Sequence, residues 1–292
     1  MNRIKGILYA AVSSSTFGLA PFFSITLLLA GFSAFEVLSY RWGVASIVLI
    51  VFGWLSGCNF RLAGKDWGVV FLLSLLRAVT SFSLIIAYQN IASGVASTIH
   101  FMYPLAVSLA MMFFFHEKKS LLVMLAVLMS LFGAALLSSG ELEAKSCDTI
   151  VGLVAACISV FSYGGYIIGV RTTRAAQINS TVLTCYVMGM GAVLYLIGAM
   201  ATFGLHLVTD GYIWLIILGL ALPATAISNI TLVRAIKYAG PTLTSILGAM
   251  EPLTAVVIGV FVFKELFTLN SVIGILLILL AVGMVVFRKQ KS

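Results

Sequence analysis

Four ionisable side chains stand inside long apolar segments of this chain, at depths where a charge is costly. Glu251, Arg77 and His100 lie eight to eleven residues into their segments, and Arg41 lies seven residues into its own. A charged side chain at the centre of a membrane-spanning helix costs about 3 kcal/mol, so such residues face the protein interior and have partners there. A carboxylate, two guanidinium groups and an imidazole can together bind a charged solute or relay protons.

Glu251 and Arg77 each have a functional and a structural interpretation. Glu251 precedes Pro252, which frees a backbone carbonyl one turn earlier, and it is a candidate cavity carboxylate for a basic group, a proton or a cationic part of a substrate. Arg77 is the natural partner of Glu251 or of a substrate carboxylate, because its planar fork matches carboxylate geometry. For both residues, an ion pair that only fixes helix packing is an equal alternative.

His100 and Arg41 also carry two interpretations. The imidazole of His100 could relay protons, or it could be a neutral group that hydrogen-bonds a neighbouring helix. Arg41 could form an anion-attracting wall of an outward-facing vestibule, or it could extend its side chain to the outer membrane interface. Glu36, five positions before Arg41, lies close enough to the surface that we expect it to be solvated, which weakens its claim to a function.

Aromatic and amide side chains complete the candidate site. We expect three rings to lie in the same layer as the charges and to line a cavity, and one asparagine to hydrogen-bond a substrate. Packing is the alternative for the rings, and hydrogen bonding between helices is the alternative for the amide. The candidate substrate-binding residues are Arg77, His100, Tyr103, Glu251, Arg41, Tyr163, Phe17 and Asn229.

The composition identifies the medium that surrounds these segments. Of 292 residues, 62% are hydrophobic and only 9% are charged, whereas soluble domains carry about 25% charged residues. Each apolar segment approaches the roughly 20 residues that a helix needs to cross the hydrocarbon core. We expect an all-α integral membrane protein with ten transmembrane helices, at 6–27, 34–56, 68–88, 92–115, 120–139, 149–170, 181–204, 212–233, 241–263 and 268–287.

The chain contains an internal repeat. Residues 92–117 and 240–265 are two versions of one broken apolar segment, with Pro104 standing 148 positions before Pro252. Such a repeat indicates that the fold is built from two copies of one unit.

A second offset extends the repeat over the rest of the chain. At 146 positions, residues 6–18 match 152–164, and Tyr40 matches Tyr186. Five helices per copy is an odd number, so the second copy must cross the membrane in the inverted direction, and inverted repeats place a substrate near the midplane. The expected units are a first repeat at 6–139, a periplasmic connecting loop at 140–148 and a second repeat at 149–287.

The paired segments YPLAVSLAMMFFFHE and MEPLTAVVIGVFVFKE resemble the EamA domain of the drug/metabolite transporter superfamily. The resemblance runs from about residue 6 to residue 287. It implies a ten-helix carrier of small metabolites, often amino acids or other polar solutes, and often an exporter. The residues that fit the pattern are Arg41 and Ala87-Tyr88 in the first copy, and Glu251-Pro252 and Glu265 in the second.

The two copies differ beside their shared proline. His100 and Tyr103 occupy the first-copy positions at which the second copy has Gly248 and Glu251. We therefore expect the two walls of the cavity to be chemically unequal.

The distribution of basic residues predicts the orientation. With the N-terminus in the cytoplasm, the inner segments hold 13 Lys and Arg residues and the outer segments hold two, Lys145 and Lys264. By the positive-inside rule we expect both termini in the cytoplasm and the protein in the inner (plasma) membrane. The first span matches the sixth, so we expect it to be retained rather than cleaved as a signal. The basic residues at 288–291 are expected to anchor this topology, not to bind nucleic acid.

Other chemistries lack their residue patterns. The four cysteines show no C-x-x-C spacing, the three histidines are scattered, and no Gly-rich phosphate loop precedes a lysine. We expect no disulfide, metal, cofactor or ATP hydrolysis, so energy must come from substrate or ion gradients. An intramembrane enzyme or lipid-handling protein would need a nucleophile, a metal cluster or paired acids at one depth. The sequence has no such set of residues, so we expect that the protein is not an enzyme.

These observations favour a secondary transporter that exports a small polar metabolite, such as an amino acid, by alternating access. Three potential cations, Arg41, Arg77 and His100, oppose one deep carboxylate, Glu251, which favours a zwitterionic or anionic substrate. The alternative is a proton-coupled extruder of organic cations or drugs that uses Glu251 as the exchange site. The expected partners are the small-molecule substrate, the lipid bilayer and, as one candidate coupling ion, the proton. Since one chain contains both repeats, a monomer is sufficient for transport, and a dimer is also compatible with this interpretation.

Overall fold

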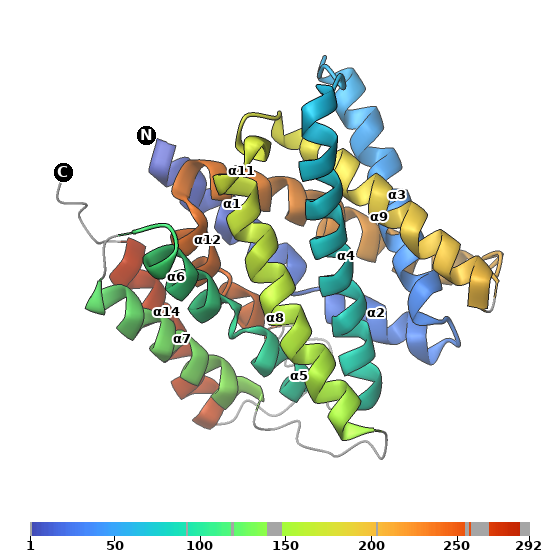
Figure 1. The fold of residues 1–292 in the computed structure, drawn as a ribbon. Coiled ribbons are helices and arrows are strands. Elements are labelled where there is room, and N and C mark those ends of the chain that lie inside the picture. Colours follow the sequence, from blue (N-terminus) through green and yellow to red (C-terminus); the bar gives the residue numbers. More distant parts are fainter. Residues whose placement is uncertain are drawn as a thin grey trace.

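In the computed structural model the protein is a bundle of helices (Figure 1). The structure describes residues 2–91, 93–117, 120–138, 148–202, 204–254, 257 and 269–286, and these form no strand. The α-helices are α1 (Asn2–Phe17), α2 (Ala20–Leu29), α3 (Ala34–Leu55), α4 (Trp67–Asn90), α5 (Ser93–His100), α6 (Tyr103–Phe113), α7 (Leu121–Ser138), α8 (Thr149–Thr172), α9 (Ser180–Thr202), α10 (Gly211–Ala221), α11 (Ser228–Ala239), α12 (Pro241–Leu247) and α14 (Leu269–Val286).

Helical segments long and apolar enough to cross a membrane account for most of the expected spans. Two shorter apolar helices, Leu121–Gly133 and Val272–Met284, fall on the expected spans at 120–139 and 268–287. The expected span at 241–263 begins with α12, and most of it beyond residue 254 lies outside the described residues. Within the described residues, seven segments meet the length and composition for crossing: Arg3–Leu29, Ala34–Leu55, Gly64–Asn90, Val95–Phe113, Thr149–Thr172, Ser180–Thr202 and Gly211–Ala239.

Three spans expected as single helices are interrupted near their middle. The chain breaks between α1 and α2, between α5 and α6, and between α10 and α11. A proline accompanies each break: Pro21 and Pro104 lie in the first turns of α2 and α6, and Pro223 lies in a π-helix at Leu222–Ile227. Proline has no amide hydrogen for the intrahelical bond and clashes with the preceding turn. Such breaks are tolerated in a membrane where the freed backbone groups face protein or a cavity.

Helices from the two halves of the chain pair along their length. α4 packs against α8, α3 against α9, α1 against α11, and α7 against α14, as Figure 1 shows for α4 with α8 and for α7 with α14. Each pair joins one helix from residues 2–138 with one from residues 149–286. The centre of the bundle is therefore an interface between the two halves.

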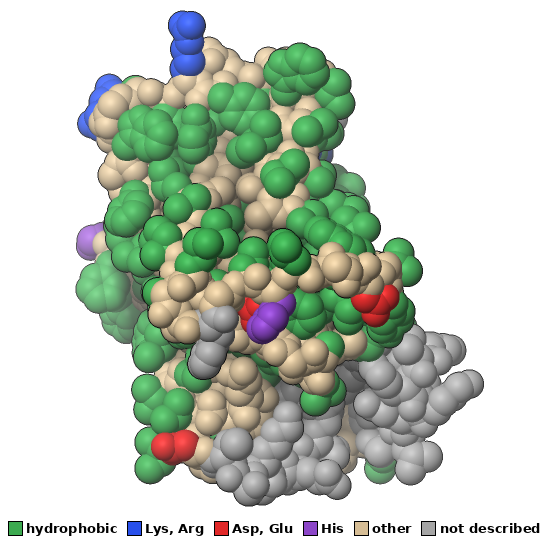
Figure 2. Space-filling model, turned by 90° about the vertical axis from the view of Figure 1, so that its right-hand side faces the viewer, with side chains coloured by type: hydrophobic (Ala, Val, Ile, Leu, Met, Phe, Trp, Pro, Cys, Tyr) green, Lys and Arg blue, Asp and Glu red, His purple; other side chains and the backbone are tan. Residues whose placement is uncertain are grey.

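The outside of the bundle is apolar. Leu121 is 91% exposed and Phe161 is 73% exposed, and Figure 2 shows hydrophobic side chains over much of the described part of one face, with few charged ones. Contiguous apolar surface of this extent is unfavourable in water, but it matches the hydrocarbon of a bilayer. The surface therefore agrees with the expectation from composition.

Polar side chains lie in the interior and join the helices. Ser13 Oγ on α1 donates a hydrogen bond of 2.9 Å to the carbonyl oxygen of Ser228 on α11. The hydroxyls of Thr80 on α4 and Ser162 on α8 lie 2.9 Å apart. Hydrogen bonds between helices are a common means of association in membranes, where apolar burial adds little. They hold the helices that carry the candidate site.

Candidate functional site

Arg77 lies at the centre of the predicted site. It is 1% exposed, and its Nε donates a hydrogen bond of 3.0 Å to Oδ1 of Asn229 on α11. Its Cζ lies 5.3 Å from the ring centroid of Phe17 on α1 and 5.0 Å from that of Tyr163 on α8. Both distances are in the range of favourable cation–π interactions. The fold thus brings four of the predicted residues together around one guanidinium group.

Arg41 approaches the same phenylalanine from α3. Its Cζ lies 5.6 Å from the ring centroid of Phe17. Its Nε donates a hydrogen bond of 2.6 Å to Oγ1 of Thr225, and its Nη2 donates one of 3.5 Å to the carbonyl oxygen of Ala224. Both acceptors belong to the π-helix at Leu222–Ile227, a kind of distortion common at functional sites. Because Arg41 is only 4% exposed, its side chain does not extend to the membrane interface.

His100, Tyr103 and Tyr163 form a second group of rings. The ring centroid of His100 lies 5.3 Å from that of Tyr103 and 5.3 Å from that of Tyr163, and the two tyrosine rings are 4.7 Å apart. Nδ1 of His100 lies 2.9 Å from Oγ of Ser159 on α8. Its Nε2 is buried and has no hydrogen-bond partner in the described part of the chain. Since Tyr163 contacts both His100 and Arg77, the two groups form one continuous site.

Gly248 allows Tyr103 to pack against the backbone that follows α12. A Cβ atom at Gly248 would lie 1.6 Å from Oη of Tyr103 and 2.8 Å from its Cζ. Only a glycine leaves room for this approach. The first copy has His100 at the position that corresponds to Gly248. A side chain at position 248 would collide with Tyr103, which is a steric reason for the expected chemical difference between the two walls of the cavity.

Glu251 is buried, but it does not form the contact ion pair expected with Arg77. Glu251 is 5% exposed, and among the described residues no nitrogen of Arg77 lies within 4.0 Å of its carboxylate. Of the two partners predicted for Arg77, Glu251 is therefore wrong as a contact partner, and a substrate carboxylate stays a prediction. The physical reason is that Asn229 holds Arg77 by its Nε while two rings, those of Phe17 and Tyr163, lie close to its guanidinium.

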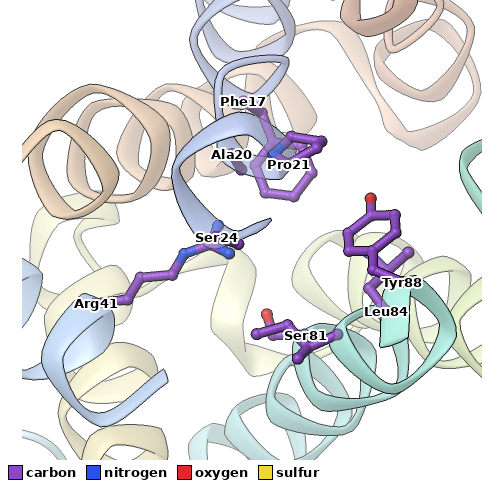
Figure 3. Close-up of a pocket in the computed structure, with 9 residues that line it drawn as sticks. Phe17, Ala20, Pro21, Ser24, Arg41, Ser81, Leu84 and Tyr88 are labelled. Atoms are coloured by element: carbon purple, nitrogen blue, oxygen red, sulfur yellow. The ribbon is translucent and has the colours of Figure 1, made fainter. Parts of the chain in front are cut away.

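A small cavity opens beside this network (Figure 3). Figure 3 shows Arg41 and Tyr88 facing the space from two sides, with Phe17 above and Ser81 below. The volume is about 20 Å³, room for roughly one water molecule. In this conformation the site is closed to a metabolite. The lining residues are Phe17, Ala20, Pro21, Ser24, Arg41, Ser81, Leu84, Ile85 and Tyr88.

Two polar residues of the site, Ser81 and Ser24, were not predicted from the sequence, and Thr225 was predicted only as one of several hydroxyl groups that hydrogen-bond a substrate or a neighbouring helix. Ser81 follows Arg77 by four positions and accepts a hydrogen bond of 3.3 Å from its Nη1. This spacing, which places two side chains on one helix face, is a signal that could have identified it. Thr225 and Ser24 lie on other segments close to helix breaks, so only the fold brings them to the site.

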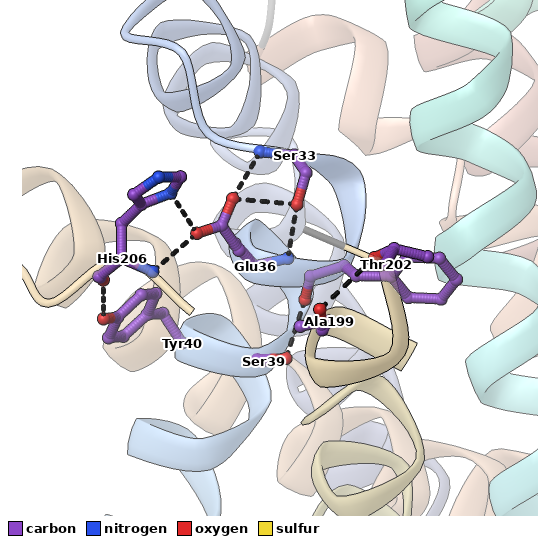
Figure 4. A network of polar contacts seen from close by, with 8 residues as sticks. Ser33, Glu36, Ser39, Tyr40, Ala199, Thr202 and His206 are labelled. Carbon is purple, nitrogen blue, oxygen red and sulfur yellow. Dashed lines mark hydrogen bonds and ion pairs between the residues drawn. The ribbon is translucent and has the colours of Figure 1, made fainter. Parts of the chain in front are cut away.

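Glu36 is not solvated, contrary to expectation. It is 1% exposed, and its Oε1 accepts a hydrogen bond of 2.8 Å from the backbone amide of His206 and lies 2.7 Å from Nδ1 of that residue. Its Oε2 accepts bonds of 2.9 and 2.8 Å from the amide and hydroxyl groups of Ser33 (Figure 4). The reason is that the segment after α9 folds over the start of α3 and covers the carboxylate.

The central site has an excess of positive charge. Arg41 and Arg77 are buried, and among the described residues neither has a carboxylate within 4.0 Å. A guanidinium in this setting is stabilised by any anionic group that enters, and its planar fork favours carboxylates and phosphates. A bundle of membrane-crossing helices that encloses such a site beside a small cavity is the architecture of a membrane transporter.

The chain belongs to the EamA-like transporter family, whose model matches residues 4–139 and again residues 150–287. An uncharacterized transporter of Archaeoglobus fulgidus is 27% identical over 236 residues, which cover 80% of this chain and 82% of that protein. A crystal structure of another protein superimposes with a TM-score of 0.80 at 18% identity, covering 97% of this chain and 96% of the other. That likeness shows a shared fold alone. The protein is therefore a multi-pass membrane transporter.

Proposed function

We propose that this transporter is a secondary carrier that exports a small polar metabolite bearing a carboxylate, such as an amino acid, by alternating access. The observation that carries the proposal is the pair of buried guanidinium groups, Arg41 and Arg77, which both lie over the ring of Phe17 and lack a contact carboxylate among the described residues. Removing two cations from water is costly unless each is paired. A substrate carboxylate between them supplies that pairing.

The remaining candidate residues have roles in the same site. Asn229 and Ser81 orient Arg77. The rings of Tyr163 and Tyr103 form a wall that fits the apolar part of a substrate. His100 offers Nε2, which is buried and unpaired within the described chain, as a hydrogen-bonding group for the substrate or as a proton carrier.

The proposed architecture is ten transmembrane helices in two inverted repeats, at 6–139 and 149–287, joined by a periplasmic loop at 140–148. Two matches of one family model support the repeat. The helix pairs support its inversion, because α4 with α8 and α1 with α11 are the pairs that a two-fold axis in the membrane plane would exchange. Residues 139–147 and most of the ninth span beyond residue 254 lie outside the described residues.

The proposed orientation places both termini in the cytoplasm of a cell whose inner (plasma) membrane holds the protein. It is supported by the count of 13 inner against two outer Lys and Arg residues. Part of that count falls on residues that the structure does not describe, namely Lys118, Lys119, Lys145, Lys264, Arg288, Lys289 and Lys291.

Alternating access is supported by the closed state of the site. A cavity of about 20 Å³ cannot hold an amino acid, so the halves must separate on one side of the membrane to admit the substrate. Because the interface between the halves runs through the site, rocking of one half against the other would open it. The family of this chain favours transport over catalysis.

Glu251 supports a second candidate function, a proton-coupled extruder of organic cations or drugs. The carboxylate is 5% exposed and is not paired with Arg77 by contact. A buried carboxylate without a contact cation can exchange a proton for a cationic substrate.

Ligand-induced thermal stabilisation tests these alternatives. Purified protein is heated with amino acids, small organic acids, nucleosides or organic cations, because a ligand that binds only the folded state raises the melting temperature. We expect a rise with carboxylate ligands that is lost in Arg77→Ala and partly kept in Arg77→Lys. Arg61→Ala, which removes an exposed arginine, is the matched control. A rise with cations alone, lost in Glu251→Gln, would overturn the proposal in favour of the extruder.

A further inference from the structure

Near the start of α3, a tyrosine ties the two halves of the chain together. The phenolic O–H of Tyr40 donates a hydrogen bond to the carbonyl oxygen of His206, in the segment that follows α9. The ring of Tyr40 meets the ring of Trp214, at the start of α10, edge to face, with centroids 6.1 Å apart and an interplanar angle of 82°. We call Tyr40, His206 and Trp214 the Tyr40 latch.

The start of α9 carries the same arrangement. The phenolic O–H of Tyr186 donates a hydrogen bond of 2.8 Å to the carbonyl oxygen of Phe60, in the segment that follows α3. The ring of Tyr186 meets that of Trp67, at the start of α4, with centroids 5.4 Å apart and an interplanar angle of 71°. We call Tyr186, Phe60 and Trp67 the Tyr186 latch.

The two latches lie at opposite ends of one helix pair. α3 packs along α9, and each tyrosine near the start of one helix reaches the segment beyond the end of the other. The two helices are therefore antiparallel, and the latches close opposite ends of the pair. Both latches cross between the halves, because Tyr40 binds residues of 149–286 and Tyr186 binds residues of 2–138.

The latches are also related by the internal repeat. Tyr40 and Tyr186 are 146 positions apart, as are Phe60 and His206, while Trp67 and Trp214 are 147 apart. The tyrosine, the carbonyl that it binds and the indole that packs on it all occur once in each copy at corresponding positions. Two of the three parts follow the offset of 146 and the third differs from it by one residue, an agreement that chance contacts on a surface would not show.

One feature of the pair is unequal. At the Tyr40 latch, the buried carboxylate of Glu36 binds both the amide and the imidazole of His206 (Figure 4). The corresponding positions at the Tyr186 latch hold Val182 and Phe60, which have no ionisable group. Hydrogen bonds to charged groups contribute more than neutral ones, roughly by a factor of two. The Tyr40 latch is therefore held more strongly.

We propose that the Tyr40 and Tyr186 latches are the two gates of alternating access, of which only one opens at a time, and that the Glu36–His206 contact makes the Tyr40 gate the harder to open. This inference rests on the alternating-access part of the proposed function, and it does not depend on the substrate. In the proposed orientation the Tyr40 gate faces outward, so the resting carrier favours a site that opens to the cytoplasm, as an exporter requires.

Side-specific labelling of the cavity tests the gates. In the full-length chain with its four cysteines replaced by alanine, Ser24→Cys places one thiol in the closed cavity. A membrane-impermeant maleimide is then added to one face or the other of oriented vesicles. Each tyrosine variant loses one neutral hydrogen bond, so we expect the maleimide to react about fivefold faster. In Tyr40→Phe the faster labelling should be seen from one face of the membrane, and in Tyr186→Phe from the opposite face. His206→Ala removes the hydrogen bond to the Glu36 carboxylate, so it should speed labelling from the same face as Tyr40→Phe, by at least about tenfold.

Two further variants sharpen the test. Tyr212→Phe removes the same hydroxyl from a tyrosine that is 61% exposed beside Trp214, and it should leave both rates unchanged. His206→Phe gives the Tyr40 latch the residue of the Tyr186 latch and should bring the rates from the two faces closer together. Melting temperatures of all variants establish that the labelling reports opening of a folded protein.

The outcomes separate this inference from the proposed substrate. If both tyrosine variants speed labelling from the same face, or if neither changes it, the latches are not gates. If labelling changes by face as expected while no carboxylate ligand is transported, the gates stand and the proposed substrate class fails. Transport of a carboxylate with labelling unaffected in both tyrosine variants would overturn the gates alone.

Discussion

Arg77 and Asn229, which are 152 positions apart in the chain, are joined by a hydrogen bond of 3.0 Å from Nε to Oδ1. The partner that orients the buried guanidinium is therefore a neutral amide. A neutral acceptor fixes the direction of the fork without cancelling its charge, whereas a carboxylate in the same place would do both. The arrangement leaves the charge of Arg77 for an incoming anion.

Asn229→Asp tests this directly. The new carboxylate would pair with Arg77 and compete with the substrate, so we expect the affinity for a carboxylate ligand to fall at least tenfold. The protein should stay folded, because the new pair is charge-balanced. Isothermal titration with the ligand found by thermal screening measures the affinity. Asn90→Asp, at the end of α4 and 13 positions beyond Arg77, is the control for an added charge. Unchanged affinity in Asn229→Asp would contradict a substrate role for Arg77.

Phe17→Leu tests the ring shared by the two arginines. Leucine keeps much of the apolar volume but loses the negative face of the ring, which lies 5.3 and 5.6 Å from the two guanidinium carbons. A cation–π interaction contributes about 0.5 to 2 kcal/mol, so we expect a lower melting temperature and slower transport in proteoliposomes. Phe161→Leu changes a ring that is 73% exposed on the outside of α8 and should have little effect. Equal effects of the two changes would indicate that only packing is involved.

Gly248→Ala tests the close approach of Tyr103. The added Cβ would lie 1.6 Å from the tyrosine hydroxyl, which forces the ring or the helix to move. We expect a loss of roughly 1–3 kcal/mol in the free energy of unfolding, in line with other overpacked positions, together with reduced transport.

The control for Gly248→Ala is a glycine inside a helix. Gly43 in α3 has no heavy atom within 4 Å of the position of its Cβ, so Gly43→Ala should be neutral or slightly stabilising through helix propensity. Combining Gly248→Ala with Tyr103→Ala should restore part of the lost stability. If the double variant lost the sum of the two single effects, the two residues would not interact.

Glu251→Gln separates the two candidate functions. The amide keeps the shape of the side chain and removes its charge. If a carboxylate substrate binds at Arg77, the ligand-induced rise in melting temperature should persist in Glu251→Gln and disappear in Arg77→Ala. The reverse pattern, in which transport survives Arg77→Ala and is abolished in Glu251→Gln, would indicate cation exchange at Glu251.

Much of the candidate site could be anticipated from the residues themselves. Arg77, His100 and Arg41 interrupt apolar segments, and that local contrast alone indicates burial; the structure shows them 1%, 2% and 4% exposed. Ser81 could have been added from its spacing to Arg77. Glu36 could not be placed, because its burial depends on a segment that begins some 170 positions later in the chain.

The sequence by itself determined that this is a membrane protein with a repeated unit, and it identified the charged side chains that must lie inside. These properties depend on composition and on offsets along one chain. The tertiary structure decided that Arg77 binds Asn229 rather than contacting Glu251, that Thr225 reaches Arg41, and that two tyrosines form hydrogen bonds across opposite ends of one helix pair. These contacts depend on how helices rotate against each other and on where prolines break them, and spacing along a single helix contains neither quantity.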